Sequence, residues 1–239
     1  MLTKRVKEYL KFLKSWFLTS GKVLWGMWKL TKLPQPAITI FGGNGAKVES
    51  EDSNKAYDLA KKLTLNGYSV ITGGGYGIMR AANKGSYDAA KEMGLLNGGD
   101  YTKMTSLGIT LTCFRHENLN PYLHEKLFMK HFFSRKLLLV RYSVGFIVFP
   151  GGFGTLDELF EIVTLEQCSR MPKMPIILIN KSYWNPIIDW LKETALKQNY
   201  IEERHLNIIS VSDSVEEIFN IIEKYCKDKT DPQNLLFNR

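Results

Sequence analysis

Apolar residues occur in six short runs between residues 37 and 211, and amphipathic stretches separate these runs. A short apolar run bounded by polar or glycine-rich sequence is typical of a strand that is buried on both faces. The predicted strands are residues 37–41, 68–72, 107–112, 145–149, 175–180 and 207–211. Apolar residues at helical spacing predict helices over 51–66, 77–93, 121–141, 155–168, 184–198 and 213–226. This alternation predicts an α/β fold, a doubly wound parallel sheet with helices on both faces.

Three glycine-rich turns follow predicted strands, at residues 42–45, 73–77 and 151–154. In doubly wound folds, ligands bind at the carboxyl ends of the strands, so we expect the three turns to lie together. The turn at 73–77 is similar to a dinucleotide-binding loop but lacks its GxGxxG spacing, and tight strand-to-helix geometry alone is the alternative. Neither this turn nor the one at 151–154 is followed by the Gly-Lys-Ser/Thr of a Walker A loop, which argues against a nucleoside triphosphatase.

The third turn lies in the segment Pro150-Gly-Gly-Phe-Gly-Thr-Leu-Asp-Glu158, between a predicted strand and a predicted helix. The exposed backbone N–H groups at the positive end of a helix bind phosphate. Two carboxylates, Asp157 and Glu158, follow one turn into the helix. A phosphate cradle beside carboxylates predicts chemistry on a phosphorylated metabolite rather than anion storage.

An Arg135-Lys136 pair stands in an apolar stretch that contains Phe132, Phe133 and residues 137–139. A cation in apolar surroundings requires an anionic partner. Glu158 and a bound phosphate are the expected partners.

The formal net charge of +8 is confined almost entirely to one end of the 239-residue chain. Residues 1–33 contain eight basic residues and one acidic residue, so the remainder is nearly neutral and we expect no nucleic-acid partner.

The three cysteines are far apart, so we expect neither a disulfide framework nor a structural zinc site, and a cytoplasmic location fits. His124 and His131 could share a helical face, but their spacing is not that of HExxH, so no metal site is expected. No apolar run of about 18 residues predicts a membrane-spanning helix, and no secretory signal is expected.

Composition divides the chain into three parts: a basic amphipathic segment at 1–36, a single domain at 37–226 and a polar tail at 227–239. Pro34 and Pro36 mark the first boundary, and residues 94–106 are expected to form an exposed loop. Residues 1–33 contain three of the five tryptophans, and apolar residues recur there at helical spacing. Such a helix either lies on an anionic membrane surface or packs on the domain or on a second subunit, and we favour packing.

The Arg135-Lys136 pair together with PGGxGTxxE at 150–158 resembles the signature of the Lonely Guy (LOG) phosphoribohydrolases, which also carry the older label "possible lysine decarboxylases". Residues 73–79, Gly-Gly-Gly-Tyr-Gly-Ile-Met, are similar to the GGGxxGxM element of that family, and the resemblance spans 37–222. It implies a Rossmann-like fold and at least a homodimer. It also implies hydrolysis of the N-glycosidic bond of a nucleoside 5′-monophosphate, AMP or a cytokinin-type nucleotide, to free base and ribose 5-phosphate. No metal or organic cofactor is expected.

Carried over by position, the resemblance implies a catalytic pair, Arg135 and Glu158. A carboxylate beside the ribose would stabilise an oxocarbenium-like transition state or position water. The implied phosphate cradle is Gly151, Gly152, Gly154 and Thr155, and the further implied substrate contacts are Gly74, Gly75, Glu117, Lys136 and Thr164. Asn44 and Arg80 depart from the family pattern near the expected site, which leaves the preferred base open.

The alternative function is a non-catalytic carrier of a nucleotide or of the molybdenum cofactor. A carrier has no use for a carboxylate beside the sugar, so Arg135 and Glu158 favour the enzyme. Lysine decarboxylase is the least favoured function, because no lysine is set apart by the burial that Schiff-base chemistry requires.

Overall fold

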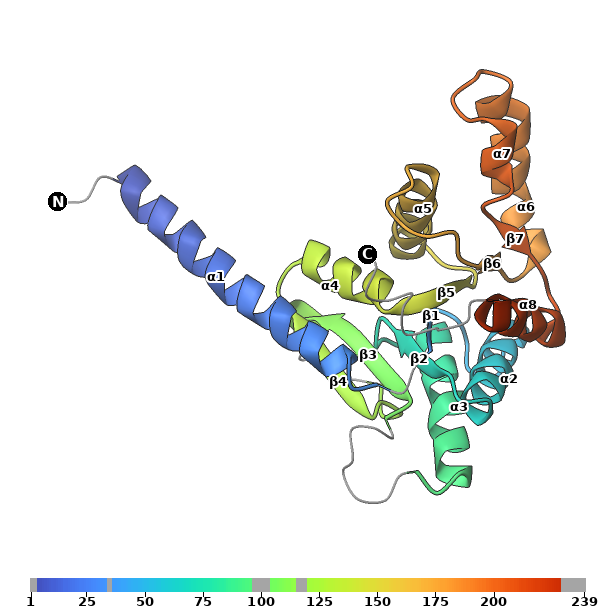
Figure 1. Cartoon of the computed structure of the whole chain (residues 1–239), viewed down its shortest axis with the longest axis horizontal. Coiled ribbons are helices and arrows are strands. Elements are labelled where there is room, and N and C mark those ends of the chain that lie inside the picture. Colours follow the sequence, from blue (N-terminus) through green and yellow to red (C-terminus); the bar gives the residue numbers. More distant parts are fainter. Residues whose placement is uncertain (1–3, 34–35, 96–103, 115–119, 229–239) are drawn as a thin grey trace.

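The computed structural model describes residues 4–33, 36–95, 104–114 and 120–228. Its described strands form one parallel sheet of seven, in the order β4-β3-β2-β1-β5-β6-β7 (Figure 1). The strands are β1 Ala37–Phe41, β2 Ser69–Thr72, β3 Ser106–Leu111, β4 Glu125–Met129, β5 Ser143–Val148, β6 Ile176–Leu178 and β7 Ser210–Val211.

Helices cover both faces of the sheet (Figure 1). One face carries α1 Lys4–Leu30, α4 Phe132–Arg141, α5 Phe153–Gln167 and α6 Lys181–Trp190. The other carries α2 Glu51–Leu65, α3 Ile78–Glu92 and α8 Val215–Asp228. Three short elements complete the described chain: a 3₁₀ turn η2 Thr112–Phe114, a π-helical turn η3 Leu191–Leu196 that continues α6, and α7 Glu203–Leu206.

Alternation along the central strand β1 supplies both hydrophobic cores. Ala37 and Phe41 pack with α4 and α5, whereas Ile38 and Ile40 pack with α2, α3 and α8. All five residues of β1 are buried because successive side chains point to opposite faces and each face is covered by helices. The predicted doubly wound, Rossmann-like fold is therefore confirmed.

The predicted helix over 121–141 is wrong in its first half. Residues 125–129 form β4, which pairs in parallel with β3, and only Phe132–Arg141 is helical. The burial of β4 alternates at its end, with Leu127 and Met129 buried and Phe128 only partly buried, as expected of an edge strand. His124 precedes β4 and His131 caps α4, so the two histidines share no helical face.

The N-terminal helix α1 is joined to the body through its last turns. Leu30 is fully buried, and the ammonium group of Lys29 lies 2.8 Å from the carboxylate of Glu125. Pro34, most of the predicted loop at 94–106 and most of the predicted tail lie outside the described residues. Within the described ranges, no helix combines the length and the apolarity needed to cross a membrane.

Helices α2 and α3 pack against each other at Gly85. A Cβ atom added to Gly85 would lie 2.1 Å from the backbone oxygen of Tyr57, whereas one added to Gly21 in α1 meets nothing within 4 Å. We predict that Gly85→Ala lowers the free energy of unfolding by about 2 kcal/mol, because the backbones must separate. Gly21→Ala should leave it unchanged or raise it by up to about 1 kcal/mol through helix propensity. Urea unfolding of both variants checks this, and equal stability would show that α2 and α3 are not closely packed.

Candidate active site

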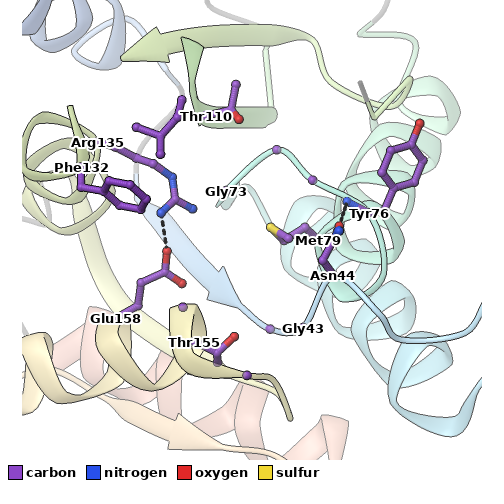
Figure 2. A pocket seen from close by; sticks show the side chains of 16 residues that line it. Gly43, Asn44, Gly73, Tyr76, Met79, Thr110, Phe132, Arg135, Thr155 and Glu158 are labelled. Atoms are coloured by element: carbon purple, nitrogen blue, oxygen red, sulfur yellow. Dashed lines mark hydrogen bonds and ion pairs between the residues drawn. The ribbon is translucent and has the colours of Figure 1, made fainter. Parts of the chain in front are cut away.

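A cavity of about 390 Å³ lies where the order of the strands reverses, at the carboxyl ends of β1 and β5 (Figure 2). This switch point is the usual ligand site of doubly wound folds, and the volume suits a small metabolite. The three glycine-rich turns meet there as predicted, since each contributes residues to its wall. The lining residues are Gly42, Gly43, Asn44, Gly73, Gly74, Gly75, Tyr76, Met79, Thr110, Leu111, Phe132, Arg135, Gly152, Gly154, Thr155 and Glu158.

An ion pair between α4 and α5 lies in the wall of this cavity. Nη1 of Arg135 donates to Oε1 of Glu158 at 2.7 Å, and Nε of Arg135 donates to the backbone oxygen of Ile109 at 3.0 Å (Figure 2). Only 15% and 10% of the two side chains are exposed. A Cβ atom on Gly73 would lie 2.3 Å from Nη2 of Arg135, so a side chain at residue 73 would displace the guanidinium from this position. Three separate elements therefore fix one charged pair.

The environment of Glu158 affects its pKa in two opposite ways. Burial raises the pKa of the carboxyl above its ordinary value, and the Arg135 guanidinium offsets part of that rise. The neighbouring Asp157 points elsewhere, with more than half of its side chain exposed. Of the two carboxylates in the motif, only Glu158 is a partly desolvated group at the cavity.

The first turn of α5 has the form of an anion site. Its N-cap is Gly152, which provides no capping side chain, so the first N–H groups of the helix have no side-chain acceptor. Gly151 lies behind the cavity, where an added Cβ atom would lie 2.2 Å from Oγ1 of Thr155. The hydroxyl of Tyr183 donates to the backbone oxygen of Gly151 and fixes the turn from outside. The cradle is thus formed by backbone that is held in place on two sides.

The turn after β2 is held by a buried polar network. Oδ1 of Asn83 accepts from Oγ1 of Thr72 at 2.7 Å and from Nδ2 of Asn120 at 2.9 Å, and Thr72 in turn accepts from the N–H of Gly74 at 3.0 Å. Across the cavity, Oδ1 of Asn44 accepts from the N–H of Tyr76 at 2.7 Å (Figure 2). Asn44, a departure from the family pattern, therefore joins the first turn to the second.

Two of the side chains predicted to contact the substrate lie outside the cavity. Lys136 faces away from the cavity and pairs with Asp157 at 2.8 Å and Glu161 at 3.2 Å on α5. Thr164 lies on the outer face of α5, where its hydroxyl donates to the backbone oxygen of Phe160. The prediction for Glu117 falls outside the described residues. Because Arg135 and Lys136 are adjacent on a helix, they cannot face the same side.

Some lining residues were not predicted from the sequence. Thr110 and Leu111 end β3, and Phe132 begins α4 with 60% of its side chain exposed. The ends of parallel strands are the signal that could have identified the first two.

Arg80 lies outside this cavity, in an adjoining depression where its guanidinium is between the rings of Tyr76 and Tyr122. Among the described residues, no group of three His, Cys, Asp or Glu side chains could hold a metal ion.

The sequence matches a known family over most of the region that forms this cavity. The family model described as "Possible lysine decarboxylase" matches residues 79–222, which is more than half of the chain. The chain therefore belongs to this family, the LOG family.

Relatives with described activities are similar over most of their length. A rice protein (Oryza sativa subsp. japonica) named "Probable cytokinin riboside 5′-monophosphate phosphoribohydrolase LOGL3" is 27% identical over 78% of this chain and 82% of its own. An Arabidopsis thaliana protein named cytokinin riboside 5′-monophosphate phosphoribohydrolase LOG4 is 26% identical over 79% of this chain and 82% of its own.

Solved structures with the same fold include molybdenum cofactor proteins. The molybdenum cofactor binding protein of Rippkaea orientalis matches with a TM-score of 0.54 at 21% identity, over 80% of this chain and 96% of that one. The molybdenum cofactor carrier protein of Chlamydomonas reinhardtii matches with a TM-score of 0.55 at 16% identity, over 81% of this chain and 99% of that one. At these identities the likeness concerns the fold alone.

Two neighbouring glycines of the cradle differ in the space around them. An added Cβ atom at Gly151 would lie 2.2 Å from Thr155 Oγ1, whereas one at Gly152 meets nothing within 4 Å. We predict that Gly151→Ala lowers the free energy of unfolding by about 2 kcal/mol. Gly152→Ala should change it by less than about 0.5 kcal/mol. Thermal unfolding of the pair checks this, and similar losses in both would contradict the close contact between Gly151 and α5.

Proposed function

We propose that this protein hydrolyses the N-glycosidic bond of a nucleoside 5′-monophosphate, AMP or a cytokinin-type nucleotide, to free base and ribose 5-phosphate. The observation that carries the proposal is the buried Arg135–Glu158 pair, which lies in one cavity with the uncapped N-terminus of α5. Family membership and the names of the plant relatives support the same reaction. In this proposal residues 37–226 form the catalytic domain, and residues 1–36 and 227–239 take no part in the chemistry.

The cradle would bind the 5′-phosphate first. Arg135 and Glu158 are the only charged side chains that line the cavity within the described part of the chain, so the phosphate would be held mainly by backbone N–H groups and the dipole of α5. Thr155 adds a hydroxyl at the third position of the helix. Phosphate binding supplies energy remote from the reacting bond and fixes the ribose beside Glu158.

Glu158 would then act on the sugar. Cleavage of an N-glycosidic bond develops positive charge on the ribose ring, and a fixed carboxylate stabilises that charge or positions the attacking water. Arg135 would orient the carboxylate and keep it ionised, since their hydrogen bond favours the charged form. Water supplies a hydroxyl to the anomeric carbon and a proton to the departing base.

A carrier without catalysis is the competing function. The structures of molybdenum cofactor proteins share the fold at low identity and do not favour their cargo for this chain. Incubating the purified protein with a panel of nucleotides, and separating the products by chromatography, distinguishes the two functions. Released base supports the hydrolase, whereas binding of a nucleotide or pterin without release supports the carrier.

The first functional prediction concerns the carboxylate. Glu158→Gln should lower kcat for AMP by about a thousandfold, because the amide cannot stabilise positive charge. Asp157→Asn makes the same chemical change at a carboxylate that pairs with Lys136 outside the cavity, and it should keep wild-type activity. Near wild-type turnover by Glu158→Gln would refute the catalytic role.

The pH dependence should reflect the same carboxyl group. Because burial raises the pKa of Glu158 and the ionised form is required, kcat/KM should fall at acid pH, with a midpoint above the ordinary pKa of a carboxyl. Assays with and without EDTA should give the same rates.

The second functional prediction concerns the phosphate. Adenosine should have a kcat/KM at least about a thousandfold below that of AMP, because it lacks the phosphate group that would bind to the cradle. Gly152→Ala places a methyl group where the phosphate would bind, so it should lower kcat/KM for AMP and leave that for adenosine unchanged. Equal rates on both substrates in the wild-type protein would remove the proposed role of the α5 N-terminus.

The third functional prediction concerns assembly. The outer faces of α4 and α5 expose aromatic side chains beside the mouth of the cavity, with Phe133 and Phe153 exposed by 63% and 91%. A groove between the same helices is lined by apolar side chains that include Phe133, Leu137 and Val140, and a second copy could cover it. We propose a homodimer through this face. Phe128 is a partly buried residue of β4 and belongs to neither helix.

Light scattering tests the dimer. Phe133→Ser with Phe153→Ser should convert the dimer to a monomer, because each removes exposed apolar area from the shared face. Tyr200→Ser removes a side chain that is 77% exposed between η3 and α7, and the dimer should survive it. A wild-type protein that is monomeric and fully active would rule this assembly out.

A further inference from the structure

Helix α1 presents three distinct faces along its 27 residues. At about 100° per residue, Thr19, Gly26 and Leu30 share one face, and all three are buried against the body. A second face carries exposed aromatic and leucine side chains, called the aromatic stripe here: Tyr9, Leu10, Trp16, Phe17, Leu24 and Trp28. A third carries a lysine stripe: Lys4, Lys7, Lys11, Lys14, Lys22 and Lys29. Three further exposed apolar residues, Phe12, Leu18 and Trp25, lie on the first and third faces. The aromatic stripe is centred roughly 130° from each of the other two faces.

The body fixes this helix but covers little of it. A Cβ atom on Gly26 would lie 2.7 Å from Leu138 of α4, so the two helices are in close contact there. Farther toward the N-terminus, Nζ of Lys130 donates to Oγ of Ser15 at 3.0 Å. The N-terminal part of α1 extends beyond α4 and away from the sheet (Figure 1). The helix is therefore held in position with its aromatic stripe in solvent, where so large an apolar surface requires a partner.

Charge identifies the kind of partner. Within the described part of the chain, the one member of the lysine stripe that forms an ion pair with a carboxylate is Lys29, which lies where α1 joins the body and contacts Glu125. Two copies of α1 packed through their aromatic stripes would bring two strongly basic helices together and repel each other. An anionic surface removes that repulsion, and Trp and Lys side chains are suited to the boundary between lipid headgroups and acyl chains.

We propose that α1 is a membrane-surface anchor, which lies in the plane of an anionic lipid bilayer with the aromatic stripe buried and the lysine stripe at the headgroups. In this orientation the body and the lysines lie on the two flanks of the helix, so neither is forced into the lipid. The helix lies on the surface and does not cross it, consistent with its lysine content. The anchor uses no residue of the cavity, so it is independent of the proposed hydrolase.

Vesicle sedimentation of the full chain tests the anchor. Because Leu30 belongs to the core, substitutions are used in place of truncation. We expect binding to vesicles of equal parts phosphatidylcholine and phosphatidylglycerol, little binding to phosphatidylcholine alone, and weaker binding as salt is added. Trp16→Ser with Phe17→Ser should lower the partition coefficient at least about tenfold, since both rings belong to the aromatic stripe that enters the lipid in this proposal.

A matched pair of charge variants separates the lysine stripe from net charge. Lys7→Gln, Lys11→Gln and Lys14→Gln together should lower binding about a hundredfold, from about fivefold for each lysine at the surface. Lys47→Gln, Lys181→Gln and Lys192→Gln remove the same charge from exposed sites on the body, and binding should stay within about threefold. Circular dichroism checks that the helix is retained. If a variant loses helix, the Trp190→Phe protein provides the test instead. Its tryptophan emission should shift to the blue when the anionic vesicles are added.

Four results would overturn the anchor. The full chain could fail to bind anionic vesicles or leave its tryptophan emission unchanged, or the two lysine triple variants could lose binding equally. Alternatively, Trp16→Ser with Phe17→Ser could break an oligomer in light scattering while vesicle binding persists, and a second copy would then occupy the stripe.

Discussion

The contact between Arg135 and Glu158 depends on the absence of a side chain at Gly73. The guanidinium occupies the space that a Cβ atom would fill, and from there it reaches a carboxylate on the next helix. A buried pair of this kind is stable only when both ions find their partners, because removing them from water costs several kcal/mol each. The turn after β2 must therefore be as rigid as the helices, and the hydrogen bonds of Thr72 and Asn83 behind it provide that rigidity.

The elements that could be predicted from the sequence are those whose local pattern agrees with their burial. The strands β1 and β5 are buried on both faces and are apolar throughout, so their interpretation was unambiguous. The edge strand β4 differs, because Leu123, Leu127 and Phe128 fall at spacings that also suit a helix. Its parallel register with β3 is a long-range contact that no local pattern encodes. The helix was therefore predicted eleven residues too long, and the edge of the sheet was missed.

The site residues also divide into those that the local sequence predicts and those that depend on how the helices pack. The glycine turns and the Arg135–Glu158 pair were predictable because strand ends converge and a cation in apolar sequence needs an anion. Lys136 and Thr164 were placed in the site by motif position, but rotation along a helix decides which way a side chain points. Lys136 is one residue beyond Arg135 and faces the outer side of α5, where Asp157 and Glu161 are its partners. A motif specifies an order of residues, and only the packed helices specify their directions.

The distribution of charge follows from how the cavity would bind its ligand. A cradle made of backbone N–H groups needs no lysine, so the body can bind a phosphate while remaining nearly neutral. The excess of basic over acidic residues lies instead in residues 1–33, where most of the lysines are exposed on α1. A ligand phosphate and an anionic surface would then be recognised by different physics: directional hydrogen bonds in a cavity for the first, and non-directional attraction on an exposed helix for the second. Because salt screens exposed charges far more than buried hydrogen bonds, the two interactions can be varied independently in one protein.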